Sequence, residues 1–269
     1  MVNLSEKQLR DKLQNIEAFV LDQDGTLYLE YQPFSWTVDF LEGLQKRGIR
    51  YLFLSNNSSK SNREHINKLV GLGIKAAPEQ ILSSGEATIE YLQSQDNWQD
   101  IYLLATPLVE KDFENAGFNI DAEKPNYVVL AYDLTCTFDK LDKASRYVRR
   151  GVPFIATHAD NNWMIGPDDY RPDVGALAAA ITASTKIEAK FIGKPNIEMI
   201  NAFLRRLGLS KDKVAIVGDR LDTDIRMGYE NDILNFLVLS GKTKKEELKD
   251  SVYQPSFVVE KTIDILNYF

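Results

Sequence analysis

The sequence predicts an α/β fold, a doubly wound and mainly parallel sheet with a second α/β domain inserted into it. Two observations lead to this prediction. Short apolar runs alternate along the chain with helix-length amphipathic stretches, and four of the apolar runs end in polar or charged clusters. A chain of 269 residues is long enough for one large domain or two modest ones.

Four strands are expected in the first and last parts of the chain. They are separated by helical patterns at residues 38–47, 61–72 and 197–207. In parallel sheets, ligands bind just beyond the carboxyl ends of the strands. One such sheet would bring the polar clusters that follow these strands to a single edge. The expected strands are Ala18–Leu21, Ile49–Leu54, Ala189–Ile192 and Val214–Val217.

The middle of the chain is expected to form a domain of its own. Residues 84–185 contain strand patterns and helical stretches of their own. The polar strand ends lie on both sides of this stretch, so we expect it to be an insertion. The first domain would then comprise residues 1–83 and 186–269. The strand patterns of the insert are 100–105, 127–131 and 153–156.

Composition narrows the class of partner. A net charge of −7 and a pI near 5.1 argue against nucleic acid or an anionic membrane as a partner. The only cysteine, Cys136, cannot form an intrachain disulfide, which suits a reducing cytoplasm. The first twenty residues lack the features of a signal peptide, and no apolar run approaches the roughly 20 residues that span a bilayer. We therefore expect a soluble, cytoplasmic protein that acts on a small molecule.

Two carboxylates follow the first strand directly. Asp22 and Asp24 stand in the segment Asp22–Thr26 (DQDGT), where Gly25 permits a tight turn. A carboxylate can accept a phosphoryl group as a nucleophile, while a second acid protonates the leaving alcohol and later activates water. Charge on Asp22 would favour the protonated form of Asp24, which suits this double role. An ordinary turn at the end of a strand would use the same residues.

A second acidic group follows the strand Val214–Val217. Mg²⁺ prefers oxygen ligands in an octahedron and keeps several waters, so one or two carboxylates plus a phosphate suffice. Asp22, the backbone carbonyl of Asp24 and Asp219 could supply that set. Asp224 would then lie outside it and orient a ligand. Carboxylates at a helix start are also favoured by the helix dipole without any metal.

Two further clusters are candidates for phosphate binding. Lys194 lies between a strand and a helix, and its ammonium group would stabilise the charge of a phosphoryl group. Ser55, Asn56 and Asn57 follow the second strand, where a hydroxyl and backbone N–H groups could surround a phosphate. A solvated lysine and a capped helix would use the same residue types.

Taken in order, the segments DQDGT, SNN, GKP and GDRLDTD resemble the motifs of the haloacid dehalogenase-like (HAD) hydrolase superfamily. The large insert between SNN and GKP resembles subfamily IIA, which contains 4-nitrophenyl phosphatases, NagD-like proteins and pyridoxal phosphate phosphatase. The resemblance covers nearly the whole chain. It implies a HAD-like, Rossmann-type core with an inserted α/β cap domain, and pairing of two copies through the cap.

The resemblance also assigns roles to single residues. Asp22 would be the nucleophile and Asp24 the general acid and base. Ser55 and Lys194 would bind phosphate. Mg²⁺ would be held by Asp22, the Asp24 carbonyl and Asp219.

One acidic position and several positions of the insert add detail to the resemblance. Asp224 matches the last acidic position of the fourth motif. The family usually has Asn where this chain has His158, and a small residue where it has Asp173. Both departures affect the choice of substrate and leave the chemistry unchanged. His158 and Trp163 are candidate substrate contacts, although His158 could be an ordinary loop residue and Trp163 could pack within the cap.

The sequence therefore predicts Mg²⁺-dependent hydrolysis of a small phosphate monoester through an aspartyl phosphate. Substrates of the 4-nitrophenyl phosphate type, sugar phosphates, nucleotides and pyridoxal phosphate all fit. A phosphotransferase or mutase shares the first half-reaction, so the motifs leave that alternative open. A phospho-acceptor signalling module also combines an aspartate, a hydroxyl and a lysine, but it lacks the large insert. A dehalogenase calls for neither an acid at Asp24 nor magnesium.

Overall fold

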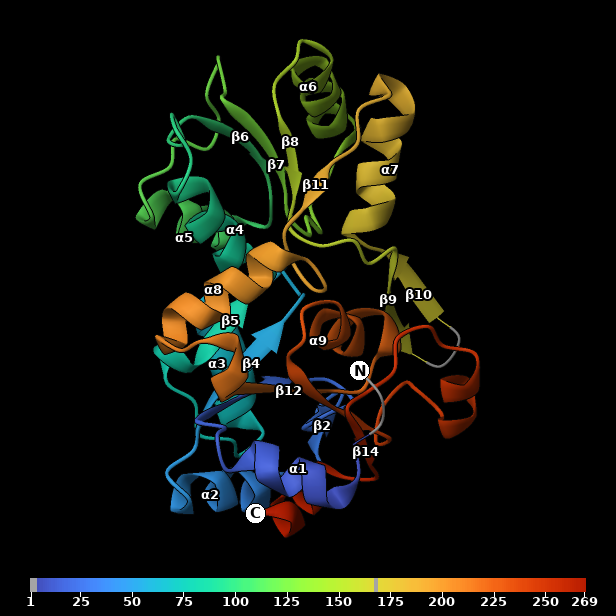
Figure 1. The fold of residues 1–269 in the computed structure, drawn as a ribbon. Helices are drawn as coiled ribbons and strands as arrows, with labels where there is room; N and C mark the ends of the chain where they lie inside the picture. The colour runs from blue at the N-terminus through green and yellow to red at the C-terminus, as the bar shows by residue number, and fades with distance from the viewer. Residues whose placement is uncertain (1–3, 167–168) are drawn as a thin grey trace. The chain divides into compact units, whose positions relative to one another are not determined.

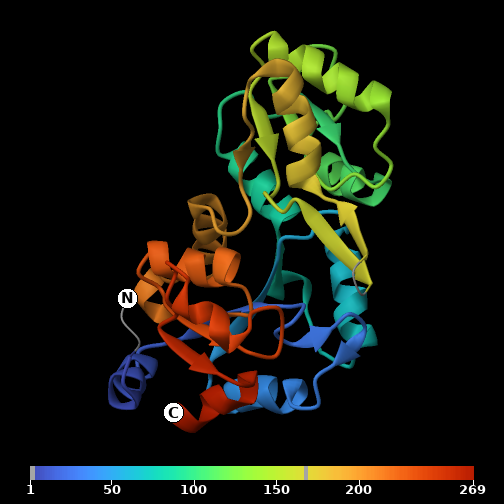
Figure 2. The same cartoon turned by 90° about the vertical axis from the view of Figure 1, so that its right-hand side faces the viewer.

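The computed structural model describes residues 4–166 and 169–269 (Figures 1 and 2). Contacts within the chain divide it into two compact units, and each unit has its own parallel sheet. Unit 1 comprises the chain up to Ser55, His65–Leu82 and Ile200–Phe269, and unit 2 comprises Asn56–Glu64 and Ser83–Met199.

Unit 1 is built on a six-stranded sheet of order β14-β13-β12-β1-β4-β5. The pairs from β14 to β4 are parallel, which confirms the predicted α/β class. In the central strand β1, Leu21 lies opposite Val217 on one side and Phe53 on the other. The strands are β1 (Ala18–Asp22), β4 (Arg50–Ser55), β5 (Ile81–Ser83), β12 (Val214–Gly218), β13 (Leu234–Val238) and β14 (Phe257–Val259).

The central strand is buried on both faces, as a covered parallel sheet requires. Phe19 and Leu21 point to one face and join a core cluster with side chains from the helices that cover it. Ala18 and Val20 point to the other face and are equally buried. Full burial of a side chain such as Phe19 is worth about 1.5–3 kcal/mol. The covering helices are α1 (Glu6–Leu13), α2 (Thr37–Lys46), α3 (Asn62–Gly71) and η5 (Thr262–Tyr268).

Several shorter elements complete unit 1. The predicted helix 38–47 corresponds to α2, the helix 61–72 to α3, and the helix 197–207 to α8. The remaining elements are β2 (Tyr28–Leu29), β3 (Gln32–Pro33), η1 (Pro78–Gln80), α8 (Ile197–Leu207), η2 (Lys211–Lys213), η3 (Leu221–Ile225), α9 (Arg226–Glu230) and η4 (Lys245–Lys249). Among the described residues, no helix has both the length and the apolar character needed to cross a bilayer.

Unit 2 contains a four-stranded parallel sheet of order β11-β8-β7-β6. Helices α6 and α7 lie side by side and pack on one face of it, where Val148 and Ala178 meet strand residues such as Leu130 (Figure 2). The elements are α4 (Ser84–Gln93), β6 (Ile101–Leu104), α5 (Pro107–Asn115), β7 (Tyr127–Leu130), α6 (Phe138–Arg149), β8 (Phe154–Ala156), the hairpin β9 (Asn162–Gly166) and β10 (Asp169–Pro172), α7 (Val174–Thr185) and β11 (Lys190–Phe191).

One predicted strand belongs to a different sheet from the one expected. The run Ala189–Ile192 was expected beside the strands that carry the acidic residues, and this expectation is wrong. β11 pairs with β8, with Phe191 opposite Ala156, and the ladder continues through a 3.1 Å bond from Ile192 N–H to the Ala156 carbonyl. An apolar run identifies a buried strand but does not tell which sheet edge it joins.

The two compact units also differ from the predicted division at 84–185. Residues 56–64 and 186–199 group with the insert. Hydrogen bonds account for both segments, because Ser58 Oγ accepts from Tyr132 N–H at 2.9 Å and Gly193 N–H donates to the Thr157 carbonyl at 2.7 Å. The segments that enter and leave the insert are therefore part of its packed body.

Candidate active site

Three of the four predicted polar clusters follow neighbouring strands. β1 lies between β12 and β4, and all three strands run parallel. Asp22 ends β1, Ser55 ends β4, and Asp219 follows Gly218 at the end of β12. These residues therefore lie at one edge of the unit 1 sheet, as the sequence predicts.

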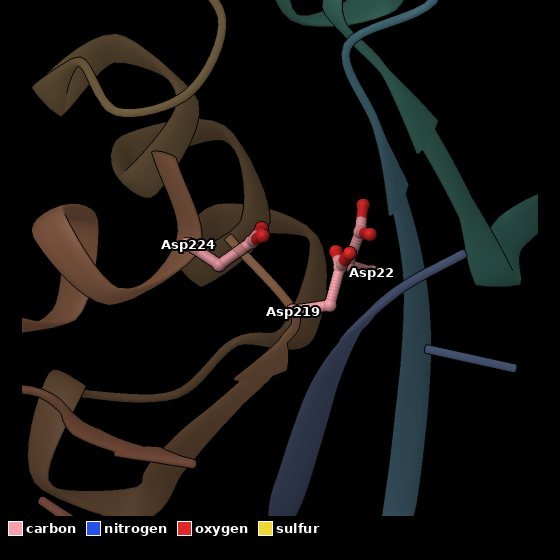
Figure 3. Close-up of side chains that lie close together, drawn as sticks. All are labelled: Asp22, Asp219 and Asp224. Atoms are coloured by element: carbon pink, nitrogen blue, oxygen red, sulfur yellow. The ribbon is translucent and has the colours of Figure 1, made fainter. Parts of the chain in front are cut away.

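Three carboxylates gather at this edge. One oxygen atom from each of Asp22, Asp219 and Asp224 lies within 4.8 Å of the other two (Figure 3). Asp219 and Asp224 are buried, at 3% and 1% exposure, while Asp22 is half-buried. Like charges so close repel one another, and a hard divalent cation with oxygen ligands removes that repulsion. The donor set therefore fits Mg²⁺.

Asp224 takes a more central place than its predicted supporting role. Its side chain points toward Asp22 and Asp219 from η3, the segment that follows β12 (Figure 3). Gly218 makes room for it, because a Cβ atom on Gly218 would lie 2.2 Å from Asp224 Cγ. Asp224 Oδ2 also accepts from Thr223 Oγ1 at 3.3 Å. Asp224 can therefore act as a direct ligand as well as an orienting group.

Asp24 lies in a different environment. Its side chain is 57% exposed and its Oδ2 lies 3.8 Å from Lys68 Nζ of α3. Lys68 Nζ also lies 4.1 Å above the ring of Tyr28. Burial raises the pKa of Tyr28 well above its usual range, and the charges of Asp24 and Asp22 add to the increase. At 57% exposure the carboxylate of Asp24 is accessible to solvent, and it is not one of the three carboxylates of the cluster.

The turn that carries Asp24 depends on glycine. Gly25 has φ +81, and a Cβ atom there would lie 2.3 Å from Asp219 Oδ2. The Gly25 N–H closes the turn on the Tyr28 carbonyl at 2.7 Å. Glycine is thus required at position 25 for two reasons: its positive φ angle and the close approach of the Asp219 carboxylate.

The two asparagines after β4 use their side chains within the protein. Asn56 Oδ1 accepts from Lys194 N–H at 2.8 Å, and Asn56 Nδ2 donates to the Lys194 carbonyl and to Asp160 Oδ2 at 3.2 and 2.9 Å. Asn57 Oδ1 accepts from the N–H and the hydroxyl of Ser59, at 2.9 and 2.8 Å. Six residues separate β4 from α3, so neither asparagine stands at the helix start. The side chains of both asparagines therefore have partners within unit 2, and phosphate binding by Ser55, Asn56 and Asn57 stays a prediction.

Lys194 belongs to unit 2, where it follows β11. It is buried, at 3% exposure. Gly193 lets the chain pass close to Asn56, because a Cβ atom there would lie 2.7 Å from Asn56 Oδ1. The Asn56 side chain thus binds both the N–H and the carbonyl of Lys194, and Gly193 leaves room for it.

The two candidate substrate contacts of the insert, His158 and Trp163, both contact other side chains of unit 2. His158 is 1% exposed, and its Nε2 lies 3.0 Å from Asp173 Oδ1. Trp163 packs on the core of unit 2, with its ring 5.9 Å from that of Tyr132 in an edge-on arrangement. Both side chains therefore have structural partners within unit 2.

Sequence reasoning missed one segment at this site. Residues 239–243 follow β13 and contact Asp219, with Lys242 N–H donating to Asp219 Oδ2 at 2.6 Å. The apolar run Phe236–Leu239, which ends at Ser240-Gly241, was the signal that could have revealed it.

A carboxylate-bearing turn at the end of a central parallel strand, beside a group of carboxylates that fits a divalent cation, is the arrangement expected of the active site of an α/β enzyme. Family comparison gives the particular family. A family model described as haloacid dehalogenase-like hydrolase matches residues 19–119, and a second, HAD-hydrolase-like model matches residues 191–265. The chain belongs to the HAD-like hydrolase superfamily, within subfamily IIA.

Individual relatives extend over almost the whole chain. The 5'-nucleotidase YutF of Bacillus subtilis is 28% identical over 258 residues, which cover 95% of this chain and 100% of the relative. An acid sugar phosphatase of Staphylococcus haemolyticus is 32% identical, with 91% and 93% covered. The crystal structure of a 4-nitrophenylphosphatase from Thermotoga maritima matches with a TM-score of 0.90 and 37% identity, covering 95% of this chain and 98% of that one.

Proposed function

We propose that this protein, a phosphatase of the HAD-like superfamily, hydrolyses small phosphate monoesters with Mg²⁺ through an aspartyl phosphate on Asp22. The observation that carries the proposal is the meeting of the Asp22, Asp219 and Asp224 carboxylates at the end of β1. Asp24, two residues along the turn, is the accessible second acid that the chemistry needs.

The reaction has two displacements at phosphorus. In the first, a carboxylate oxygen of Asp22 bonds to phosphorus, the bond to the ester oxygen breaks, and the Asp24 carboxyl group gives its proton to the leaving alcohol. In the second, Asp24 takes a proton from water as the water oxygen bonds to phosphorus. The bond to Asp22 then breaks, inorganic phosphate leaves, and both residues return to their starting state.

The carboxylates of Asp22, Asp219 and Asp224, with the backbone carbonyl of Asp24, are the proposed Mg²⁺ ligands. When bound, the cation neutralises the negative charge that the nucleophile and the phosphate bring together. Ser55, the N–H groups of Asn56 and Asn57, and Lys194 are proposed to bind the phosphate oxygens. The cap role of unit 2 is part of the same proposal.

The substrate class is supported by the relatives. Their names include an acid sugar phosphatase and a 5'-nucleotidase, so a sugar phosphate or a nucleotide is favoured. Phosphate release from a panel of monoesters with Mg²⁺ would rank these against pyridoxal phosphate. A mutase would instead isomerise a sugar phosphate with little free phosphate, so the phosphate balance separates the two reactions.

Replacement of the nucleophile tests the proposal. Asp22→Asn should lower Mg²⁺-dependent release of phosphate from 4-nitrophenyl phosphate on the order of 10⁴-fold or more. Asp222→Asn is the matched control, because Asp222 is exposed and pairs with Arg220 at 3.1 Å, outside the carboxylate cluster. The control should keep its activity within about threefold. Near-normal turnover by Asp22→Asn would refute Asp22 as the nucleophile.

Three further expectations from the sequence accompany the proposal. They are a homodimer that pairs through the cap, a cytoplasmic location, and a small molecule rather than nucleic acid or membrane as the partner. Sedimentation equilibrium of the purified protein tests the dimer directly, and a monomer at all concentrations would contradict it.

A further inference from the structure

The segment Leu239–Thr243 wraps around Asp219. It follows β13, which lies next to β12 in the sheet, so its course brings it past the residue that follows β12. Two backbone N–H groups of the segment point at Asp219. Lys242 N–H donates to Asp219 Oδ2 at 2.6 Å, and Thr243 N–H donates to the Asp219 carbonyl at 3.2 Å. Asp219 is therefore fixed at both its main chain and its side chain.

The same carboxylate oxygen is enclosed by two glycines. A Cβ atom on Gly241 would lie 2.1 Å from Asp219 Oδ2, and one on Gly25 would lie 2.3 Å from it. No real Cβ atom approaches an oxygen so closely. Each glycine therefore leaves room for Oδ2, and no other residue would fit without displacing the carboxylate.

The segment is also tied to the turn of Asp24. Ser240 Oγ donates to the Gly25 carbonyl at 2.8 Å, and the Gly241 Cα lies close enough for a Cβ atom on Gly25 to meet it at 3.1 Å. Ser240 thus joins the chain after β13 to the turn after β1. The positions of Asp24 and Asp219 are linked through this one side chain.

Electrostatics explains why such support is needed. The oxygens of Asp22, Asp219 and Asp224 lie within 4.8 Å of one another, where like charges push a flexible carboxylate away. A hydrogen bond from a backbone N–H to a carboxylate is charge-assisted and stronger than a neutral one. The Lys242 N–H and the two glycines therefore fix the orientation of the Asp219 carboxylate within the cluster.

We infer that Ser240, Gly241 and Lys242 are positioning residues for the cation site, which act by fixing the Asp219 carboxylate and the Asp24 turn before a cation binds. The inference rests on the proposed function, since it concerns the same Mg²⁺ site. The Lys242 side chain has no part in it, because the contact is made by its backbone N–H.

Mn²⁺ binding to the whole chain tests this inference without measuring turnover. Mn²⁺ serves as a spectroscopic substitute for Mg²⁺, and its affinity is measured by electron paramagnetic resonance. The melting temperature of each variant in EDTA shows whether the variant is folded. Gly241→Ala and Lys242→Pro should weaken Mn²⁺ binding at least about tenfold, the usual effect of removing a supporting contact. Lys242→Ala keeps the N–H and should bind within about twofold of the parent protein.

A glycine elsewhere in unit 1 supplies the second control. Gly71 ends α3, and a Cβ atom there would meet no neighbouring heavy atom within 4 Å, so Gly71→Ala should bind Mn²⁺ normally. Ser240→Ala removes only the contact to the Gly25 carbonyl and should weaken binding about threefold, while Ser240→Thr restores it. The Ser240 pair gives the answer if Gly241→Ala or Lys242→Pro does not fold.

The outcomes separate this inference from the proposed function. The role of the segment is overturned if folded Gly241→Ala or Lys242→Pro binds Mn²⁺ as tightly as the parent protein. If neither variant folds, the same result in Ser240→Ala overturns it. Equal losses in Lys242→Ala and Lys242→Pro overturn it as well, because the N–H would then be irrelevant. If the parent protein binds no Mn²⁺ at all, the proposed metal site itself fails.

Discussion

His158 Nε2 lies 3.0 Å from Asp173 Oδ1, in a contact that joins the two positions at which the insert departs from the family pattern. Both side chains are buried, and Asp173 Oδ1 also accepts from Val174 N–H at 2.7 Å at the start of α7. The imidazole of His158 thus shares a hydrogen bond with the Asp173 carboxyl group through Nε2, and its Nδ1 lies 3.1 Å from Thr157 Oγ1. The two departures therefore form one paired feature of unit 2.

The pairing predicts energetic coupling. His158→Asn and Asp173→Ala should each destabilise the protein by about 1–3 kcal/mol, because each leaves a buried polar group without its partner. The double variant should lose less than the sum, by about 0.5–2 kcal/mol. Urea unfolding of the four proteins measures the coupling. Strict additivity would mean that the contact contributes nothing to stability.

The Asn56 side chain predicts an effect on phosphate binding through Lys194. Asn56→Asp keeps the acceptor for Lys194 N–H but loses both donated hydrogen bonds and places a second carboxylate beside Asp160. A displacement of about 1 Å in a binding group can cost 10²-fold, so we expect kcat/KM for 4-nitrophenyl phosphate to fall by about 10- to 100-fold.

A reciprocal exchange supplies the control for Asn56. Asp160→Asn alone keeps an oxygen acceptor for Asn56 Nδ2 and should have little effect. Combined with Asn56→Asp, it restores one hydrogen bond and removes the charge repulsion, so activity should partly return. If the double variant is no more active than Asn56→Asp alone, the contact between residues 56 and 160 does not contribute to activity. The loss in Asn56→Asp would then come from its contacts with Lys194.

The carboxylate cluster predicts that removing one of its charges stabilises the protein without a cation and weakens cation binding. Asp224→Asn should raise the melting temperature in EDTA, because it removes one of three mutually repelling charges. The same change should weaken Mn²⁺ binding at least about tenfold. Differential scanning calorimetry with and without the cation measures both effects. A lower melting temperature in EDTA would mean that the hydrogen bonds of Asp224 outweigh the repulsion.

Much of this site could be predicted because its residues follow strands directly. Asp22, Ser55 and Asp219 each end or follow a short apolar run, and the carboxyl ends of parallel strands meet at one edge. Local sequence also marks Gly25, since a turn with positive φ favours glycine. Such features depend on a few neighbouring residues, which the sequence displays.

Other features depend on contacts between distant segments. Lys190–Phe191 is a short strand that fits either sheet by pattern, and its place is fixed by its backbone pairing with β8. The contact of Lys242 N–H with Asp219 comes from a backbone atom, which every residue except proline possesses. His158 and Asp173 are fifteen residues apart, and their contact depends on where α7 begins, so the sequence left His158 open between a substrate contact and a loop residue.

Tyr102 of β6 predicts a loss of stability in alkali. Burial, followed by the charge of Asp121 and the nearby Tyr147, raises the pKa of Tyr102 to about 12. The unfolded chain would ionise near the ordinary value of about 10. Because the folded-state pKa is the higher one, the stabilising contribution is complete below about pH 10 and is lost as the pH rises toward about 12.

The comparison of Tyr102 with phenylalanine isolates this effect. Tyr102→Phe removes the ionisable hydroxyl, whose hydrogen bond to the Lys140 carbonyl is long at 3.4 Å, and keeps the ring beside Lys143 Nζ at 4.8 Å. The parent protein should therefore lose stability more steeply than the variant between about pH 10 and about pH 12, as measured by urea unfolding at each pH. Parallel pH curves for the two proteins would show that Tyr102 ionises equally easily in the folded and unfolded chain.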